Sequence, residues 1–470
     1  MPRLRSWVAR HVAYPLALTL ESARRGAGWR PMRQLRELAA LARAEPHVWQ
    51  EFRDRQLRLC LAHALRHIPF YRPLADRLLP RVEDDPLGTL AELPILTKRV
   101  VQEHEKDLLS DPPPPGGRVR TSTSGSTGEP TRFWLDLRRC RFRTLVGFRS
   151  KVLCGWRPGD PGALIEASPA FFWRRPWPRR LLNWLGGTYT ELNVHEITPD
   201  SARAFLERLE RRRAIYIRGI ASGIDETAKC LEAQGLAPRA QGLGLIAILS
   251  ACEQLHPHQR ERIERVFGTE VINLYGCNEF GVVATECHAH RGLHVNADTL
   301  VVEILDDAGR PVPRGESGRI VVSDPWNLGF SLLRLDLGDL GHTLADDAPC
   351  PCGVTLPRLA AVEGRTIDFL TLPDGSRVHG LRFAGYLNAC EGVRYYRLDQ
   401  ERPEELILWL VGDPAAAEPQ LAKLRASMPP GMQLRIEYCD ELPLTPRGKR
   451  LLVLARPSDA RPDAAEVEPT

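Results

Sequence analysis

The chain reads Thr121-Ser-Thr-Ser-Gly-Ser-Thr-Gly-Glu-Pro-Thr131 between Val119-Arg120 and Arg132-Phe-Trp-Leu135, two runs that favour strands. Residues 123–131 include five hydroxyl side chains and two glycines. Glycine lets a backbone approach an anion closely, and successive backbone N–H groups form an anion-binding nest. We therefore expect a β-hairpin whose tip binds phosphate, with a plain Ser/Thr/Gly linker as the alternative. No lysine follows Gly128, so the loop is not of the Walker type.

From Val119 to about Glu363, short apolar runs alternate with stretches of helical periodicity. This alternation is typical of a layered, largely parallel sheet with helices on its faces. Thr299–Leu305 and Gly318–Ser323 are also strand-like, and a turn signal separates them. The predicted buried strands are Ala163–Ala167, Ala214–Ile217, Leu243–Leu249 and Val271–Tyr275, and the predicted helices are Pro199–Arg213 and His256–Phe267.

Two smaller units flank this core. The residues before it favour helix, as in Val48–His67, where apolar residues recur at helical spacing. After Gly364-Arg365 we expect strands and one helix, at Arg394–Asp399, Glu405–Val411, Gln433–Tyr438 and Ala415–Met428. The predicted fold class is α/β: a large layered N-terminal domain with a helical N-terminal segment, plus a small, mobile α+β C-terminal domain. The predicted boundaries are 1–110 for the helical segment, 111–364 for the core, 365–456 for the small domain and 457–470 for a disordered tail.

The composition is typical of a folded protein with several domains. The 470 residues are 43% hydrophobic and 26% charged, and the formal net charge of +5 is too small to favour a nucleic-acid partner. Eleven cysteines in so long a chain do not form a disulfide scaffold. The apolar stretch from Val12 to Leu20 is half the length of a spanning helix, and no cleavage site follows it. We expect a cytoplasmic protein without a transmembrane segment, and a homodimer is one option for its assembly.

Five motifs, in order along the chain, resemble those of one enzyme superfamily. Thr123–Pro130 resembles the phosphate-binding signature of the adenylate-forming enzymes, which include acyl-CoA synthetases, peptide-synthetase adenylation domains and luciferases. The other four motifs are Tyr275-Gly-Cys-Asn-Glu279, Leu332-Leu-Arg-Leu-Asp-Leu-Gly-Asp339, Gly364-Arg365 and Leu444-Thr-Pro-Arg-Gly-Lys449. Further runs resemble the phenylacetate-CoA ligase (PaaK) and CapK-like branch, namely His67-Ile-Pro-Phe-Tyr71, Leu93-Pro-Ile-Leu-Thr-Lys98 and Glu279-Phe-Gly-Val-Val-Ala-Thr-Glu-Cys287.

The resemblance implies a large adenylation domain and a small lid that together activate a carboxylic acid with ATP and Mg²⁺. A carboxylate attacks the α-phosphate, pyrophosphate leaves, and the acyl group then passes from the acyl-adenylate to a thiol, usually that of coenzyme A. By resemblance, Glu279 binds Mg²⁺, Asp339 accepts hydrogen bonds from the ribose hydroxyls, and Arg365 lies near the ribose and phosphate. The other implied nucleotide-binding residues are Thr123, Ser124, Gly125, Ser126, Thr127, Gly128, Tyr275, Gly276 and Asn278.

Lys449 is the implied catalytic lysine. Its ammonium would bridge the attacking carboxylate oxygen and the α-phosphate, a role that suits a compact point charge. The chain has only six lysines, which makes the position notable. Three residues depart from the family's pattern: Asn278 replaces a hydroxyl residue, Ile367 occupies a hinge position that is often acidic or lysine, and Arg447 replaces a small residue. An amide can still donate to phosphate, whereas the other two departures concern the rotation of the small domain.

The resemblance also sets the substrate expectations. The default substrate is an aryl or arylacetic acid, and we expect its pocket on loops that follow strands. Two other readings stay open: transfer of the acyl group to a carrier protein, sugar or amine in polysaccharide biosynthesis, and a nucleotide-binding protein that has lost turnover. The candidate residues of the acyl pocket are Ile217, Arg218, Gly219, Ala251 and Glu253.

A second group of residues has the chemistry of a metal site. Cys350-Pro-Cys352-Gly353, together with Cys287 and a histidine, could form a closed Cys₃His site for structural Zn²⁺. His294 is the expected fourth ligand, and His288 and His290 are its rivals. Because the two segments lie far apart in sequence, this interpretation depends on the fold bringing them together. The alternative is that these are buried thiols and surface imidazoles.

Overall fold

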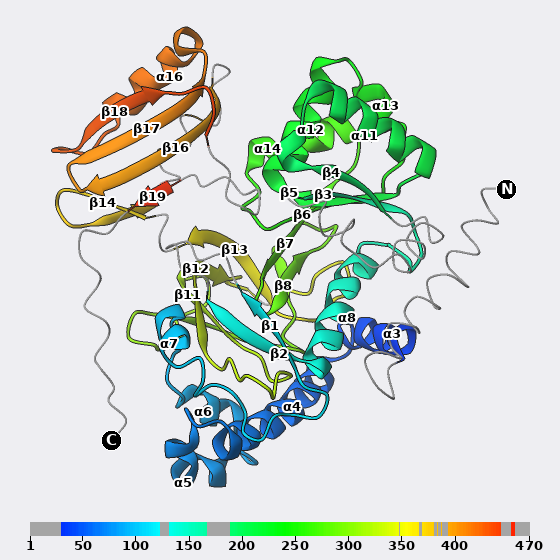
Figure 1. Ribbon diagram of the computed structural model, residues 1–470, viewed down its shortest axis with the longest axis vertical. Coiled ribbons are helices and arrows are strands. Elements are labelled where there is room, and N and C mark those ends of the chain that lie inside the picture. Colours follow the sequence, from blue (N-terminus) through cyan, green and yellow to red (C-terminus); the bar gives the residue numbers. More distant parts are fainter. Residues whose placement is uncertain are drawn as a thin grey trace.

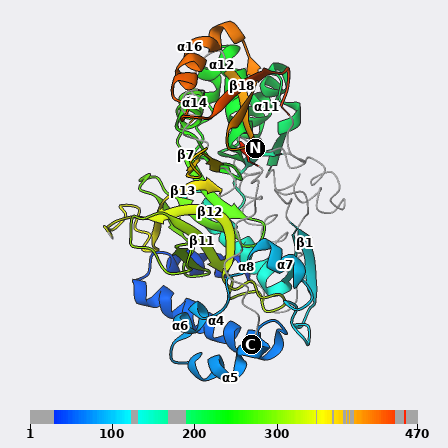
Figure 2. The ribbon, with the colours of Figure 1, turned by 90° about the vertical axis from the view of Figure 1, so that its left-hand side faces the viewer.

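The computed structural model describes residues 30–122, 131–166, 189–346, 348–365, 369–379, 393–442 and 453–455, with the single positions Phe383 and Leu387. Its course through one large and one small body is shown in Figures 1 and 2. In the described part of the chain, no helix is both long enough and apolar enough to cross a membrane.

The first described segment is helical, as predicted for its part of the chain. Its helices are α3 (Pro31–Leu41), α4 (Pro46–His67), α5 (Ala75–Leu78), α6 (Pro86–Ala91) and α7 (Lys98–Glu103). Three of them begin with proline at the first turn, where its missing N–H costs no hydrogen bond. The α7 helix begins after Thr97, whose hydroxyl accepts a 3.2 Å hydrogen bond from the Val100 N–H. The buried face of α4, with Leu57 and Leu61, joins one apolar cluster with Phe330 and Leu333 of the large body.

The main sheet has eleven strands in the order β10-β11-β12-β13-β9-β8-β7-β6-β5-β3-β4. The four pairs β4–β3, β3–β5, β5–β6 and β6–β7 are parallel, and the remaining pairs, from β7–β8 to β10–β11, are antiparallel. This is the layered α/β sheet expected from the alternation. The strands are β3 (Gly162–Glu166), β4 (Tyr189–Asn193), β5 (Tyr216–Ile220), β6 (Ala247–Ala251), β7 (Val271–Cys277), β8 (Gly281–Glu286), β9 (Leu293–Val295), β10 (Val301–Leu305), β11 (Gly318–Ser323), β12 (Leu335–Thr343) and β13 (Arg358–Arg365).

Helices cover both faces of the parallel half of this sheet. Successive side chains of a strand point to opposite faces, and here both faces are buried: Ile248 of β6 packs in one apolar cluster, and its neighbour Leu249 packs in another. The first cluster lies under α11 and α12, and the second under α8. These strands therefore read as continuous apolar runs. The helices are α8 (Leu137–Leu153), α11 (Pro199–Arg212), α12 (Ala221–Ala233), α13 (Ala237–Gln241) and α14 (Pro257–Phe267).

A separate two-stranded ribbon frames the hydroxyl-rich loop. Its strands are β1 (Arg118–Ser122) and β2 (Arg132–Asp136), and they pair antiparallel with Ser122 opposite Arg132. The ribbon is anchored at Asp136, whose Oδ2 accepts a 2.8 Å hydrogen bond from the Leu328 N–H. In Figure 1 the ribbon lies in front of β8, in the lower half of the molecule.

The small C-terminal body has its own apolar core. Its main sheet has the order β18-β17-β16-β19, and one helix packs on it. Leu398, Leu408 and Leu421 are fully buried in that core. Its elements are β14 (Phe369–Thr371), β15 (Arg377–His379), β16 (Val393–Arg402), β17 (Glu405–Gly412), α16 (Pro414–Ala426), β18 (Gln433–Tyr438) and β19 (Val453–Ala455). The structure thus has a large α/β body and a small sheet body, as predicted, while the boundaries of the four predicted segments stay a prediction.

Candidate active site

The turn between β7 and β8 carries four of the residues that sequence analysis assigned to the nucleotide. Tyr275 and Gly276 lie near the end of β7, which is Cys277, and Asn278 and Glu279 follow in the turn. The two strands approach so closely here that a Cβ on Gly276 would lie 2.3 Å from the carbonyl oxygen of Gly281. Only glycine fits at such a contact. The motif's glycine is thus explained by the packing of backbone on backbone.

Two arginines of α8 hold this turn. The Arg139 guanidinium donates a 2.7 Å hydrogen bond to the Phe280 carbonyl, and Arg143 donates one of the same length to the Asn278 carbonyl. Arg139 is itself buried and ion-paired with Asp324. Sequence analysis missed both arginines, because a basic helix of an arginine-rich chain gives no signal that distinguishes them.

Glu279 is only 4% exposed, although it lies in a turn. A carboxylate so placed has the hard oxygen atoms that Mg²⁺ prefers. Its neighbour Cys277 differs from an ordinary thiol: burial first, and then the nearby Glu279 carboxylate, raises the pKa of Cys277 well above its usual value. The turn therefore places one buried carboxylate beside a thiol that stays protonated.

Asp339 and Tyr275 meet across the sheet. The Tyr275 phenol donates a 2.7 Å hydrogen bond to Oδ2 of Asp339, which lies on β12. In the β12–β13 ladder Asp339 stands opposite Arg365. The strand β13 pairs with β9 at Arg358 and Leu359, near its start, and its end at Arg365 lies beyond this pairing. The fold thereby brings residues of three distant motifs to one place.

Two parts of the predicted site lie outside the described residues. They are the hydroxyl-rich loop, with Thr123, Ser124, Gly125, Ser126, Thr127 and Gly128, and the lysine Lys449. The strands β1 and β2 are paired as far as Ser122 and Arg132, so the two ends of that loop begin at the same end of the ribbon. The positions of the loop and of Lys449 relative to Asp339 remain a prediction.

The candidates for the acyl pocket do not lie as expected. Ile217, Arg218 and Gly219 belong to β5 itself and not to a loop after it. Ile217 is fully buried in the core, and a Cβ on Gly219 would meet the Ile165 carbonyl oxygen at 2.7 Å. Packing within the sheet accounts for both positions, and the expectation that these two residues lie on a loop after a strand is wrong. The error arose because the strand begins later, at Tyr216, than the apolar run suggested.

The remaining three candidates have polar or edge positions. Arg218 pairs with Glu166 of β3 at 2.9 Å, and Ala251 is the last residue of β6. Glu253 follows β6 and accepts a 3.0 Å hydrogen bond from the Ser222 N–H in the first turn of α12. Glu253 therefore stabilises a helix N-terminus, a favourable place for a carboxylate. Arg218, Ala251 and Glu253 stay candidates.

The cysteine and histidine group is assembled as predicted. One ligand atom from each of its members lies within 4.8 Å of the others, and the members are Cys287, His294, Cys350 and Cys352. The Cys287 and Cys350 sulfur atoms are 3.5 Å apart, and Cys352 Sγ is 3.2 Å from His294 Nε2. Burial lowers the pKa of His294 from its usual value. Two segments that are distant in sequence thus meet at one point.

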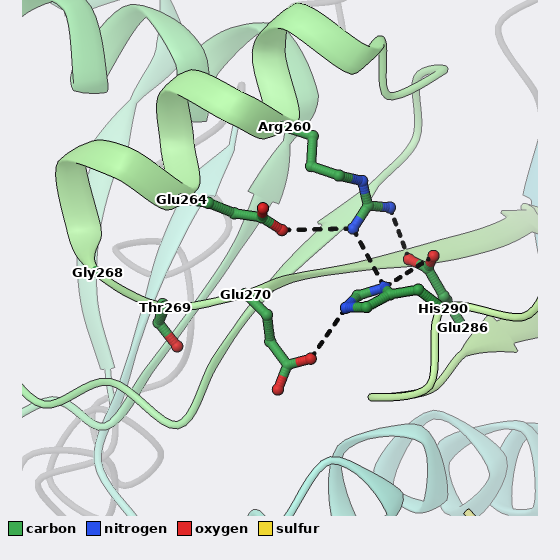
Figure 3. Close-up of a pocket in the computed structure, with 7 residues that line it drawn as sticks. All are labelled: Arg260, Glu264, Gly268, Thr269, Glu270, Glu286 and His290. Carbon is green, nitrogen blue, oxygen red and sulfur yellow. Dashed lines mark hydrogen bonds and ion pairs between the residues drawn. The ribbon is translucent and has the colours of Figure 1, made fainter. Parts of the chain in front are cut away.

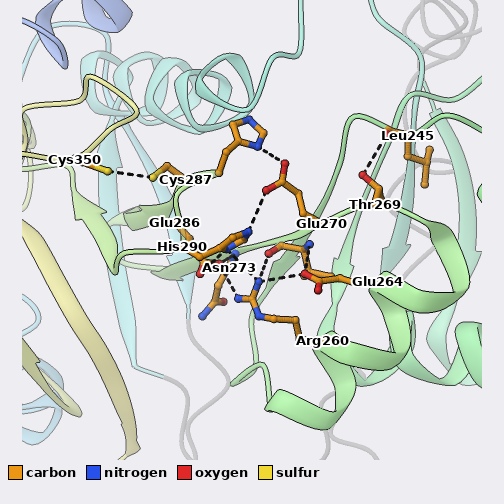
Figure 4. A network of polar contacts seen from close by, with 12 residues as sticks. Leu245, Arg260, Glu264, Thr269, Glu270, Asn273, Glu286, Cys287, His290 and Cys350 are labelled. Carbon is orange, nitrogen blue, oxygen red and sulfur yellow. Dashed lines mark hydrogen bonds and ion pairs between the residues drawn. The ribbon is translucent and has the colours of Figure 1, made fainter.

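The rival histidines have other partners. His290 lies 3.0 Å from both Glu270 and Glu286, and His288 contacts Glu270 as well. Figure 3 shows His290 between these carboxylates in a cavity of about 590 Å³, lined by Arg260, Glu264, Gly268, Thr269, Glu270, Glu286 and His290. Figure 4 shows the same network beside Cys287 and Cys350. Because its charges pair with one another and none of the predicted nucleotide residues lines it, this cavity is distinct from the candidate active site.

Comparison with known proteins gives a domain and a fold. Residues 186–329 match the family of the AMP-binding enzymes. No curated protein matches the chain by sequence. A crystal structure of 2-hydroxyisobutyryl-CoA ligase in the postadenylation state with R3-HIB-AMP is similar, with 20% identity over 86% of this chain and 89% of that one, at a TM-score of 0.66.

Two further structures extend the comparison. The same ligase with 2-HIB-AMP and CoA in the thioesterification state has a TM-score of 0.51, with 21% identity over 86% of this chain and 89% of that one. The anthranilate CoA ligase AuaEII with anthranoyl-AMP also has a TM-score of 0.51, with 18% identity over 71% and 65% of the two chains. Residues 186–329 thus match the AMP-binding enzyme family, and the fold of the chain is similar to that of these CoA ligases.

Proposed function

We propose that this protein is an AMP-forming acid–thiol ligase that activates a carboxylic acid, by resemblance an aryl or arylacetic acid, and passes it to coenzyme A. The observation that carries the proposal is the meeting of Tyr275, Asp339 and the Arg365 backbone, from three motifs, beside the turn of Glu279. An AMP-binding domain over residues 186–329 supports the same conclusion. The resemblance to the phenylacetate-CoA ligase and CapK-like branch supports the choice of acid.

In the first half-reaction, an oxygen of the substrate carboxylate forms a bond to the α-phosphorus of ATP, and the bond to pyrophosphate breaks. Catalysis of this kind depends on positioning and on charge neutralisation. Asp339 would orient the ribose, and its own orientation is fixed by the phenol of Tyr275. Glu279 would hold Mg²⁺, which neutralises phosphate charge when it is bound.

Lys449 and the hydroxyl-rich loop complete the proposed site. The hydroxyls and N–H groups of residues 123–128 would donate to the β- and γ-phosphates. The Lys449 ammonium would bridge the attacking oxygen and the α-phosphate. In the second half-reaction the coenzyme A sulfur attacks the acyl carbon, AMP leaves, and the thiol proton passes to solvent.

The two half-reactions imply two positions of the small body. The TM-score to 2-hydroxyisobutyryl-CoA ligase is 0.66 for its postadenylation state and 0.51 for its thioesterification state. We infer that the small body stands here closer to its place in the first state, and that it rotates before thioester formation. In the present arrangement the Lys229 ammonium of α12 lies 5.3 Å from the ring centre of Tyr395 on β16, a cation–π contact between the two bodies.

Exchange of label between pyrophosphate and ATP tests the first half-reaction. We expect exchange that depends on an added carboxylic acid, measured over a panel of aryl, arylacetic and short aliphatic acids. Lys449→Ala should abolish it, while Lys423→Ala, which removes an exposed lysine of the same small body, should leave it unchanged. Undiminished exchange in Lys449→Ala would remove the assigned role, and nucleotide binding without exchange by any acid would favour a protein that has lost turnover.

Product analysis then identifies the acceptor. With the best acid, ATP and coenzyme A, we expect the acyl-CoA and AMP in equal amounts. If coenzyme A gives no product while a carrier protein, a sugar or an amine does, the protein is an adenylating acyltransferase of the kind suggested by CapK-like relatives. Whichever acceptor is used, the variant Asp339→Asn tests the binding of ATP apart from the binding of the acid. It should raise the KM for ATP and leave the KM for the acid unchanged.

A further inference from the structure

We propose that the chain holds one structural Zn²⁺ in a closed four-ligand site formed by Cys287, His294, Cys350 and Cys352. These residues come from the end of β8, from β9 and from the connection between β12 and β13. The proposal is independent of the proposed ligase activity, since none of the four belongs to the candidate active site.

The distances fit one small tetrahedral ion. With Zn–S bonds of about 2.3 Å, two sulfur ligands of a tetrahedron lie about 3.8 Å apart, and a sulfur and a nitrogen slightly less. The Cys287 and Cys350 sulfur atoms are 3.5 Å apart, and Cys352 Sγ is 3.2 Å from His294 Nε2. Since all four ligand atoms lie within 4.8 Å of one another, one ion can reach all of them.

A hydrogen bond from Nδ1 of His294 orients the other ring nitrogen, Nε2, toward the thiols. His294 Nδ1 lies 3.2 Å from the carbonyl oxygen of Leu356. A carbonyl can only accept, so the proton of the neutral ring is on Nδ1, and Nε2 carries the lone pair. That lone pair faces Cys352. Zinc-bound imidazoles are commonly oriented by such a bond from the other ring nitrogen.

The turn at Cys350–Gly353 is built to present two sulfur atoms. The Gly353 N–H donates a 3.0 Å hydrogen bond to the Cys350 carbonyl, and the Val354 N–H donates to Cys352 Sγ at 3.4 Å. Gly353 has φ of +76°, a conformation that glycine adopts freely. These two hydrogen bonds hold the turn in the conformation that places both sulfur atoms near Cys287 and His294.

Burial and the partners of neighbouring groups favour an ion over a chance cluster. Cys287, His294 and Cys350 are 6%, 3% and 8% exposed. A disulfide would need sulfur atoms about 2.05 Å apart, well below the 3.5 Å observed between Cys287 and Cys350. The rivals His288 and His290 contact Glu270 instead. Four protein ligands leave no open position, so the ion would be structural and not catalytic.

The place of the site in the fold indicates what the ion would stabilise. The residue opposite His294 in the β9–β13 pair is Arg358, at the start of β13. The same strand ends at Arg365, opposite Asp339 of β12. A zinc ion at the far end of this hairpin would therefore fix the register of the two strands that carry Asp339 and Arg365.

Metal analysis of the intact protein tests the proposal. After purification under reducing conditions, we expect about one zinc per chain by inductively coupled plasma mass spectrometry, as for a closed site. Each of Cys287→Ser, Cys350→Ser and Cys352→Ser should lower that content severalfold. Cys154→Ser is the matched control, because Cys154 is buried to a similar degree but lies outside the cluster, and it should keep the full content.

A second measurement does not depend on the folding of any variant. Replacement of zinc by Co²⁺ in the wild-type chain should give the intense visible bands of a tetrahedral site together with a thiolate-to-cobalt charge-transfer band. A reduced wild-type protein that contains no zinc and takes up neither Zn²⁺ nor Co²⁺ would overturn the proposal. A bond between Cys287 and Cys350, found by peptide mapping of the untreated protein, would overturn it as well.

Discussion

Tyr275 fixes the carboxylate of Asp339 through a 2.7 Å hydrogen bond, although the two residues are 64 positions apart. The motif that contains Tyr275 and the motif that contains Asp339 are therefore parts of one hydrogen-bonded unit. The phenol donates to Oδ2 of that carboxylate, so the side chain of Tyr275 restricts the orientation of Asp339. This arrangement gives Tyr275 a positioning role for the proposed ribose contact.

Removing that phenol should weaken ATP binding without removing activity. We expect Tyr275→Phe to raise the KM for ATP roughly 3- to 10-fold, the range that corresponds to one lost hydrogen bond. The measurement is pyrophosphate exchange at several ATP concentrations. Tyr71→Phe is the control, because it removes a buried phenol bonded to the Ser331 carbonyl, away from the site, and should lower stability only. An unchanged KM in Tyr275→Phe would show that the bond does not orient Asp339 for the nucleotide.

A single methyl group at Gly276 should damage the turn that carries Glu279. Its Cβ would lie 2.3 Å from the Gly281 carbonyl oxygen, so the strands must separate. We expect Gly276→Ala to cost about 1–3 kcal/mol in the free energy of unfolding and to lower exchange strongly. Urea unfolding and exchange assays measure both effects.

The matched control is Gly147→Ala in α8, where an added Cβ meets nothing within 4 Å. This change should stabilise the protein by up to about 1 kcal/mol, because alanine favours helix over glycine. If the two variants behaved alike, the close approach of β7 and β8 would not be what requires the motif glycine.

The ion pair between Arg149 and Asp298 should be costly to break. Both side chains are fully buried, and Arg149 also donates a 3.2 Å hydrogen bond to the Leu38 carbonyl, so it joins α3 and α8 to the segment after β9. We expect Asp298→Ala to lower the free energy of unfolding by about 3–5 kcal/mol, since it leaves a buried charge unpaired. Arg33→Gln breaks the exposed Arg33–Glu37 pair instead and should leave the urea midpoint where it is. Equal small effects of both changes would contradict this view of the buried pair.

The thiol at Cys277 should resist alkylation. Burial and Glu279 raise its pKa well above the ordinary value, so little thiolate is present near pH 8. Iodoacetamide at that pH should label the exposed Cys252 first and leave Cys277 largely unmodified, as read by peptide mass spectrometry. Glu279→Gln removes one cause of the shift and should speed labelling of Cys277. Rapid labelling of Cys277 in the wild-type protein would contradict the raised pKa.

Sequence alone predicts the elements that have clear start and stop signals. The helix expected over Pro199–Arg213 spans Pro199–Arg212 in the structure, because Thr198 caps its start and Arg213, with φ of +52°, ends it. The strand Gly318–Ser323 is found with the predicted bounds. Strands without such signals shift: the apolar run Leu243–Leu249 includes Gly244 with φ of +63°, and β6 begins only at Ala247.

The candidate site is predictable in its parts and not in its contacts. The motifs assign Tyr275 and Asp339 to the same nucleotide, but the hydrogen bond between them joins β7 to β12, which are separated by three strands in the sheet order, and no local pattern specifies such a contact. The arginines Arg139 and Arg143, which hold the β7–β8 turn, lie far from it in sequence and look like ordinary surface residues. The meeting of the cysteine and histidine residues was predictable, because few residue types can bind zinc and a closed site needs four of them together.

The connection between β12 and β13 also determines where the chain can be lengthened. Ala345 and Asp346 are exposed, and a longer loop costs little entropy, about 0.6 kcal/mol for each doubling of its length. The segment from Cys350 to Leu356, by contrast, is held by three hydrogen bonds. The Gly353 N–H donates to the Cys350 carbonyl, the Val354 N–H donates to Cys352 Sγ, and His294 Nδ1 donates to the Leu356 carbonyl. A peptide tag or a fluorescent label inserted after Ala345 would therefore be tolerated, and one inserted after Pro351 would not.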